Sequence, residues 1–193
     1  MLKGIYRGMQ RSNSSTDMNR FFEDIDDMVE GALDEFAEVD SEGVSVDQLI
    51  SNIEELDNCR DFREIFTLVK RSVKETLHVS RTGLMLYLAD LPLRVGAFHR
   101  LSSNGIVLNR TLLNMVATTT RSGSELNSFV YSILLHEYLH SLGYVDERKV
   151  RRLVYRIARR TFGKDHIVTE MAVRGPWRVI PRIPYTIDHA YGG

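Results

Sequence analysis

The sequence contains a single cysteine, only four prolines and no long hydrophobic run. Cys59 cannot form an internal disulfide, which is typical of proteins in a reducing intracellular compartment. The longest uninterrupted apolar run covers residues 84–89, whereas a membrane-spanning helix needs about 20 residues. The first 16 residues are basic and polar and lack the apolar core of a secretory signal. These absences predict a cytoplasmic protein that has no membrane partner.

What the sequence does contain is typical of a globular protein. Of its 193 residues, 43% are hydrophobic and 26% are charged, enough for one domain with a substantial core. The net charge of −1 conceals an uneven distribution. Residues 17–64 carry 17 acidic and 3 basic side chains, whereas residues 65–193 carry 9 acidic and 19 basic ones. Such a division predicts that the two parts face each other or that each faces an outside partner.

Apolar spacing and turn residues divide the chain into expected helices and strands. Together they predict an α+β fold, in which helices pack on a small, mostly antiparallel sheet. An acidic helical segment, residues 1–57, is expected to precede a domain over residues 58–193. Helices are expected over residues 16–40, 45–56, 59–78, 111–120, 124–142 and 146–163. Ser45 is the expected N-cap of the second helix, and Ser122 with Glu125 is an expected capping box at the start of the fifth. A buried strand is expected over 83–91 and a hairpin over 94–101 and 105–110, before an irregular tail from Gly175.

The stretch HEYLHSLGYVDE, residues 136–147, carries the clearest chemical signal. Residues four apart on a helix lie on one face, so His136 and His140 can converge on one metal ion. Zinc binds imidazole nitrogen at about 2.0–2.1 Å and lowers the pKa of its bound water to about 7. Glu137 lies at the flank of that face, where a carboxylate can take the proton of such a water as general base.

A catalytic zinc site needs a third protein ligand. Gly143 allows the chain to leave the helix through a left-handed turn that curls back toward the two histidines. Asp146 follows three residues later, and we predict that it supplies the third ligand. Glu147 and Glu170 remain alternatives.

The pattern H-E-x-x-H-x-x-G-x-x-D resembles the extended zinc-binding motif of the metzincin branch of zincin metallopeptidases. Most metzincins have histidine at the last position, and the bacterial snapalysins resemble this sequence in having aspartate. The resemblance implies zinc as cofactor, with His136, His140 and Asp146 as ligands and Glu137 as general base. It also implies a methionine in a tight turn beneath the metal, for which Met171 is the candidate.

The order of elements before the motif also resembles the upper subdomain of zincins, with a backing helix, a small sheet and then the active-site helix. In that arrangement an antiparallel edge strand binds extended substrate through its backbone. Gly96, Ala97 and Phe98 are the candidates for that edge, and His99 is the one further histidine expected near the cleft. The resemblance therefore implies hydrolysis of peptide bonds in a peptide or an unfolded protein.

Two other interpretations are open. The chain could have a zincin fold that binds zinc but no longer cleaves, and so acts as a scaffold. Alternatively, the helix expected over residues 147–162 carries enough arginine on one face to contact nucleic-acid phosphates around a structural zinc. A charged face on an amphipathic helix is more often simply solvated, so nucleic acid is the weaker expectation.

Overall fold

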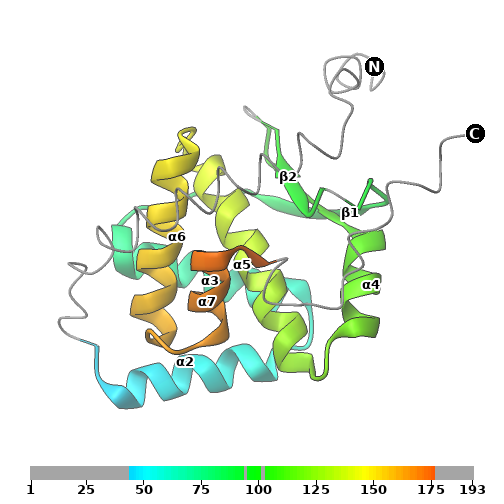
Figure 1. The fold of residues 1–193 in the computed structure, drawn as a ribbon. Coiled ribbons are helices and arrows are strands. Elements are labelled where there is room, and N and C mark those ends of the chain that lie inside the picture. The colour runs from blue at the N-terminus through cyan, green and yellow to red at the C-terminus, as the bar shows by residue number, and fades with distance from the viewer. Residues whose placement is uncertain (1–43, 94, 101–102, 177–193) are drawn as a thin grey trace, which may run out of the picture. The chain divides into compact units, whose positions relative to one another are not determined.

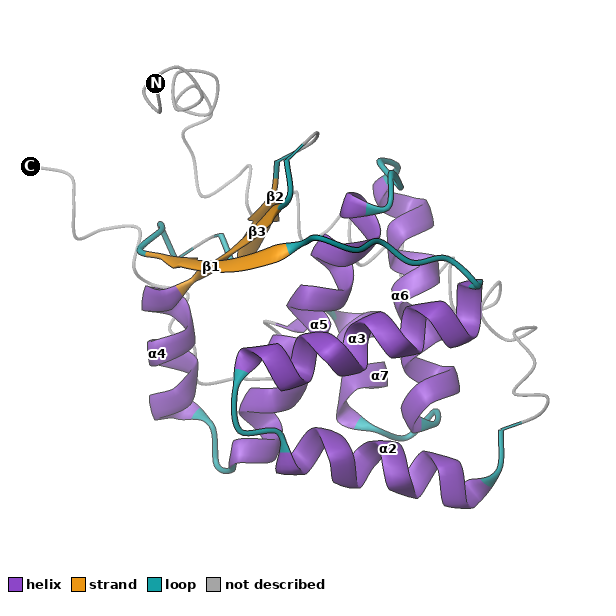
Figure 2. Cartoon of the chain, turned by 180° about the vertical axis from the view of Figure 1, so that it is seen from behind, coloured by secondary structure: helices purple, strands orange, loops and turns teal. Residues whose placement is uncertain are grey.

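A computed structural model of the protein describes residues 44–93, 95–100 and 103–176. Within these ranges the chain forms six helices and three strands, which confirms the α+β prediction (Figures 1 and 2). The elements are α2 (Val46–Asn58), α3 (Phe62–Leu77), β1 (Met85–Ala89), β2 (Ala97–His99), β3 (Gly105–Asn109), α4 (Arg110–Thr119), α5 (Gly123–Ser141), α6 (Glu147–Phe162) and α7 (Ile167–Arg174).

The first described helix belongs to the same unit as the rest. Contacts divide the chain between residues 40 and 41, so the boundary predicted at residue 57 falls inside α2. Leu56 of α2 is fully buried in the common core, because one face of this helix packs on α5 and α6. The helix expected over 16–40, most of the acidic segment and the tail from residue 177 lie outside the described residues.

Helix α5 runs through the centre of the helical layer (Figure 1). It packs against α2, α3, α4, α6 and α7, and the sheet lies against it through β2 and β3. Apolar side chains surround it on nearly every side, and Phe129, Leu134 and Leu139 are fully buried. An all-round apolar helix is stable only when it is enclosed, which explains why the segment with the two histidines lies at the core of the fold.

The sheet is mixed, with strand order β1-β3-β2. β2 and β3 form the predicted antiparallel hairpin, whereas β1 pairs with β3 in parallel. The expectation of a mostly antiparallel sheet is therefore wrong. Hydrophobic alternation sets which face of a strand is buried, but it does not specify which neighbour the strand pairs with.

The prediction of a buried strand over residues 83–91 is right about the strand and wrong about its burial. β1 lies at an edge of the sheet, and its side chains at Met85, Tyr87 and Leu88 are exposed. Only β3, the central strand, has fully buried side chains, at Ile106 and Leu108. A continuous apolar run is typical of a strand covered on both faces, whereas the helices of the described residues cover only one face of this sheet.

Polar side chains cap the helices where the sequence indicates. Ser45 and Ser122 accept hydrogen bonds from the backbone N–H of Gln48 and Glu125, at 3.2 Å in each case. The Glu125 carboxylate reaches back to the N–H of Arg121 at 2.7 Å, which is close to the predicted capping box. These caps satisfy N–H groups that have no partner within the helix.

The buried Asn109 joins β3 to the loop after β1. Its side chain accepts hydrogen bonds from the N–H groups of Leu91 and Leu112, and donates to the carbonyls of Leu91, Pro92 and Val95. Asn109 thus caps α4 and fixes Leu91, Pro92 and Val95, which precede β2 in the chain.

Helix α7 was not predicted, because its eight residues are too few to give a clear periodic pattern. His166 caps its N-terminus by accepting a hydrogen bond from the Val168 N–H at its Nδ1, at 3.3 Å. Its ring stacks on Phe162 with centroids 4.9 Å apart. Burial lowers the pKa of His166, and the nearby charge of Asp57 only partly opposes this effect.

We expect this histidine to make stability depend on pH. Because its pKa is lower in the folded chain, the unfolded chain binds the proton more readily, and protonation also removes the acceptor for the cap. The stabilisation should be complete above the unfolded pKa of about 6.5 and be lost as pH falls below it. In H166N the free energy of unfolding, measured with denaturant, should depend less on pH below about 6.5, because asparagine caps a helix without titrating. If the free energy of unfolding of H166N fell with pH as steeply as that of wild type, this role of His166 would be contradicted.

None of the helices in the described part of the chain is both long enough and apolar enough to cross a membrane.

Candidate metal centre

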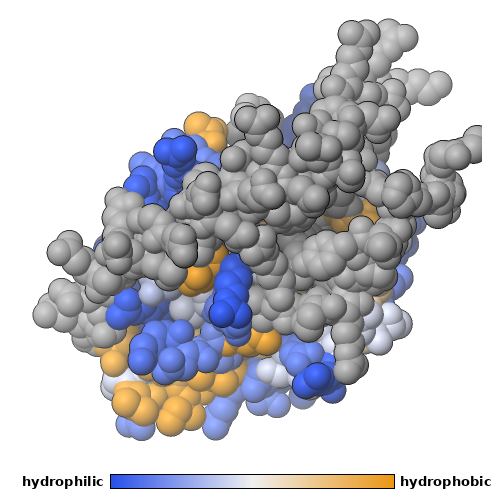
Figure 3. All heavy atoms as spheres, viewed as in Figure 1, coloured by the Kyte–Doolittle hydropathy of each residue, from blue (hydrophilic) through white to orange (hydrophobic). Residues whose placement is uncertain are grey.

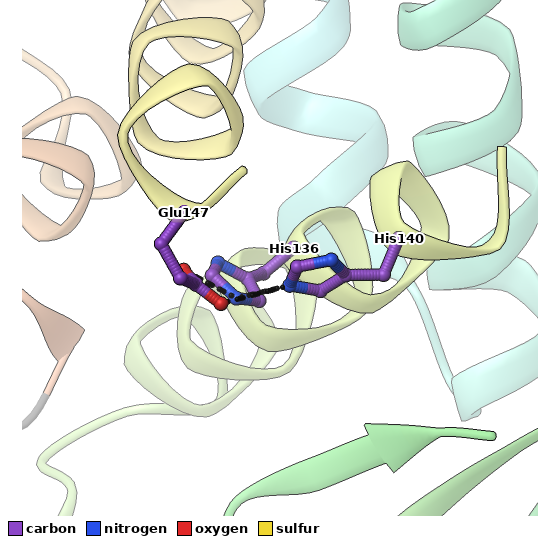
Figure 4. A group of neighbouring side chains, drawn as sticks. All are labelled: His136, His140 and Glu147. Carbon is purple, nitrogen blue, oxygen red and sulfur yellow. Dashed lines mark hydrogen bonds and ion pairs between the residues drawn. The ribbon is translucent and has the colours of Figure 1, made fainter. Parts of the chain in front are cut away.

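Three potential metal ligands meet where α5 ends and α6 begins (Figure 4). His136 and His140 come from the last turns of α5, and Glu147 is the first residue of α6. Gly143 connects the helices with a φ of 95°, which confirms the predicted left-handed turn. This backbone reversal, which favours glycine, directs the start of α6 back over the histidine face.

The three side chains point toward one another (Figure 4). The two Nε2 atoms lie 3.0 Å apart, Glu147 Oε1 lies 3.1 Å from His140 Nε2, and Glu147 Oε2 lies 3.5 Å from His136 Nε2. Ligands of a tetrahedral zinc ion are separated by about 3.3–3.4 Å, given metal–ligand bonds of about 2.0–2.1 Å. The donor set and its spacing therefore fit a zinc ion.

His140 is oriented by a backbone carbonyl. Its Nδ1 lies 2.8 Å from the carbonyl oxygen of Tyr144, which can only accept a hydrogen bond. Nδ1 therefore carries the proton and Nε2 presents a lone pair to the centre of the group. Metal-binding histidines are commonly oriented in this way by a partner on the other ring nitrogen.

Glu147 is ionised at neutral pH. Its pKa is lowered to about 2, mainly by a hydrogen bond with His136 and further by electrostatic interactions with His136, His140 and Arg151, although burial opposes the shift. The same side chain is 58% exposed. An anionic carboxylate beside two imidazoles is a donor set that zinc binds in other proteins.

Asp146, the predicted third ligand, lies next to this group but has a different contact. It is the N-cap of α6, and its carboxylate accepts a hydrogen bond from the Lys149 N–H at 2.7 Å. Among the described residues, the set of converging ligand atoms contains Glu147 and not Asp146. The local reason is the helix start, because an aspartate just before the first turn satisfies an otherwise unpaired N–H. The geometry thus favours Glu147, one of the two alternatives drawn from the sequence.

Glu170, the other alternative, lies elsewhere. It pairs with Arg174 at 3.0 Å within α7 and is not among the converging ligand atoms.

Glu137 lies between the histidine face and the sheet. Burial raises the pKa of its carboxyl group, with a smaller contribution from the negative charge of Glu147. Electrostatic interactions with His136 and His140 and a hydrogen bond from the backbone of His99 oppose this shift. A half-buried carboxylate with a raised pKa accepts a proton more readily than an exposed one.

The predicted edge strand lies beside this glutamate. β2 is at the edge of the sheet opposite β1 and contacts α5. The carbonyl of Gly96 accepts from the Asn109 N–H at 3.0 Å, so the alternation of an antiparallel ladder directs the backbone groups of Ala97 and His99 outward. Phe98 projects from the outer face of the sheet and is 41% exposed. The backbone of Ala97 is thus available at the edge, while that of His99 is turned toward Glu137.

Met171 is not in a turn. It lies within α7, is buried, and accepts a hydrogen bond at its sulfur from Ser132 Oγ at 3.4 Å. The expectation of a tight methionine turn is therefore wrong, because residues 167–174 are helical. Ser132 precedes His136 by one helical turn, so Met171 nevertheless packs on the face of α5 that carries the histidines.

Helix α6 also carries the predicted basic face. Its exposed basic side chains are spread over the length of the helix, and they are Arg148, Lys149, Arg152, Arg156 and Arg160. The Lys149 ammonium lies over the Tyr144 ring, 5.2 Å from its centroid. No contact among the described residues tests whether this face binds nucleic acid, so that role stays a prediction.

Two contributions to the site were not visible in the sequence. The Tyr144 carbonyl orients His140, and the His99 backbone contacts Glu137. Both are main-chain groups, which every residue type carries, so no side-chain pattern could identify them. His99 had been expected near the cleft only from its position on the edge strand.

No protein-family model, no curated protein and no solved structure matches this chain.

Proposed function

We propose that this protein is a zinc-dependent metallopeptidase with a zincin-like, metzincin-like arrangement of its active site. The observation that carries the proposal is the triangle formed by His136, His140 and Glu147, whose ligand atoms are 3.0–3.5 Å apart. Two further features support it, a glutamate directly after the first histidine and, beside it, the outward backbone of Ala97 on an edge strand of the described sheet.

In this proposal two imidazoles and one carboxylate hold the ion. When bound, a zinc ion supplies Lewis acidity, which polarises a carbonyl group and lowers the pKa of water to about 7. The Glu137 carboxylate accepts a proton from the water molecule whose oxygen attacks the peptide carbonyl carbon. It later donates this proton to the amine nitrogen, as the peptide C–N bond breaks. The raised pKa of Glu137 suits both roles, because a group whose pKa is closer to the working pH can both accept and release a proton.

The edge of β2 binds the substrate backbone. An extended peptide adds to a strand edge through main-chain hydrogen bonds, which depend little on the substrate sequence. Ala97 presents its N–H and carbonyl outward, next to the position of Glu137. The proposed substrate is therefore a peptide or an unfolded protein segment that can adopt an extended conformation.

The proposal is tested by metal analysis and a cleavage assay on the full chain. We expect one equivalent of zinc in protein prepared without chelator, cleavage of an unfolded protein, loss of cleavage with chelator, and recovery when zinc is added. Absence of a stoichiometric metal, or cleavage that chelator does not affect, would contradict it. Bound zinc without cleavage of any peptide tested would favour the scaffold interpretation.

Zinc should also stabilise the fold. A ligand that binds only the folded chain adds about 4.1 kcal/mol to the free energy of unfolding at a thousandfold excess over its Kd. We expect zinc to raise the melting temperature of the wild-type chain, whereas H140A should lose most of this rise. Equal stabilisation of both proteins would place the bound zinc at a different site.

A further inference from the structure

The outer face of the sheet and the free edge of β1 are unusually apolar. Four of the eight large hydrophobic side chains exposed in the described part of the chain lie on this sheet, and they are Met85, Tyr87, Leu88 and Phe98. The remainder are distributed over α2 and two loops. Figure 3 shows apolar surface at the lower left, over the region of α2. By register, Tyr87 and Phe98 lie on the outer face with Val107, whereas Leu88 lies on the inner face with Leu108. Exposed apolar side chains gathered on one sheet favour an interface there.

The free edge of β1 can pair with another strand. β1 bonds to β3 on one side only, and no other described strand lies on its second side. It is also the longer of the two edges, five residues against three in β2. A strand edge leaves N–H and carbonyl groups without partners and is a template for further pairing.

Nothing in β1 protects that edge. Proteins commonly place a charge, a proline or a bulge on an exposed edge strand, but residues 82–89 contain no charged residue and no proline. The flanking charges are engaged within the chain. Arg81 donates to the carbonyls of Ser141 and Ser103, and Asp90 pairs with Arg110 at 3.1 Å.

Two copies of β1 placed side by side and antiparallel would bring apolar side chains opposite each other. With Tyr87 opposite Tyr87, Leu86 lies opposite Leu88 and Met85 lies opposite Ala89. Every pair is apolar, each pair lies on the same face of the sheet, and no like charges meet. Such self-complementarity is what a two-fold symmetric contact requires.

The inner side of the edge offers room for the partner. A cavity of about 210 Å³ lies beside β1 and is lined mainly by apolar residues, including Phe62, Leu86 and Leu88. Asp61 and Arg63 also line it, and they pair with each other at 2.7 Å. Leucine side chains of an opposing strand would lie over this cavity, and Leu88, which is 46% exposed, would become covered.

We propose that β1 pairs antiparallel with β1 of a second copy of this chain, about a two-fold axis at Tyr87, to form a continuous six-stranded sheet. This leaves the β2 edge and the metal centre of each copy open, because β2 lies at the opposite edge of the sheet. The inference therefore does not depend on the proposed peptidase activity.

Charge substitutions at residue 87 test both the contact and its register. In Y87K and in Y87E like charges face each other across the axis, so each variant alone should dimerise more than about tenfold more weakly than wild type. A mixture of the two should recover the dimer, because lysine then faces glutamate. Sedimentation of the full chain over a concentration series measures all three. V46K, which places a charge on another strongly exposed apolar residue, should remain dimeric.

Hydrogen exchange gives a second measurement that needs no variant. The outward amides of β1 should exchange more slowly as protein concentration rises, while those of the α2 N-terminus should not change. A wild-type chain that is monomeric throughout, with unprotected β1 amides, would overturn the proposal in favour of a different partner or another segment of this chain. Variants that remain dimeric alone, or a mixture that stays monomeric, would overturn the proposed register.

Discussion

Replacing Glu137 by glutamine is expected to lower kcat by about 10²–10⁴-fold, the usual contribution of a general acid–base group. Glutamine preserves the volume of the side chain and its ability to accept from the His99 backbone, but it cannot take a proton. The substitution does not touch the three converging ligand atoms, so zinc content should stay at the wild-type value. Steady-state cleavage of an unfolded protein, together with metal analysis of the same sample, measures both effects.

The matched control for this variant is E125Q. Glu125 lies on the same helix but caps its N-terminus, about three turns away from the histidines. Removal of its charge should change stability slightly and leave kcat unchanged. If E137Q retained wild-type kcat, Glu137 would not be the base. If it lost zinc as well as activity, its role in proton transfer would remain unsupported, and a structural role would be indicated.

The second large effect is expected at the boundary between α5 and α6. E147A should weaken zinc binding by more than about 100-fold, because loss of even an outer-shell partner costs 10–100-fold. D146N should bind zinc nearly as well as wild type, because asparagine caps a helix as well as aspartate does. Zinc competition with a chromophoric chelator measures both affinities.

D146A separates a capping role from a ligand role. If Asp146 acts only as the N-cap, alanine should lower the free energy of unfolding by about 0.5–2 kcal/mol, and D146N should restore it. Zinc affinity should follow the same order, with a small loss in D146A. If instead D146N and D146A lost zinc equally while E147A retained it, Asp146 would be the ligand, as the sequence motif first indicated.

Much of the local structure could be predicted from short-range patterns. The four-residue spacing of His136 and His140 placed both on one helical face, and the glycine at 143 was identified as a left-handed turn. The serines at 45 and 122 were expected to start helices and do so. Each of these features depends on interactions within a few residues, which apolar periodicity and capping residues report directly.

The partner of each strand could not be predicted in the same way. The apolar run at 83–91 indicated a strand, but the parallel pairing of β1 with β3, and the exposure that follows from an edge position, depend on contacts between distant segments. The same holds for Met171, whose sequence neighbours allow either a turn or a short helix. Packing of α7 against α5 and α6 favours the helix.

The sequence by itself determined which side chains are present at the candidate centre, how two of them are spaced, and where the helix that carries them ends. Only the tertiary structure favoured Glu147 over Asp146 as the carboxylate that lies with the two histidines. Both carboxylates follow the glycine at suitable distances, but the first unpaired N–H groups of α6 hold the aspartate at the helix start. The next side chain is then directed toward the histidines. That choice depends on the angle at which two helices meet, which is set by the packing of α6 on the buried face of α5 and not by spacing along the chain.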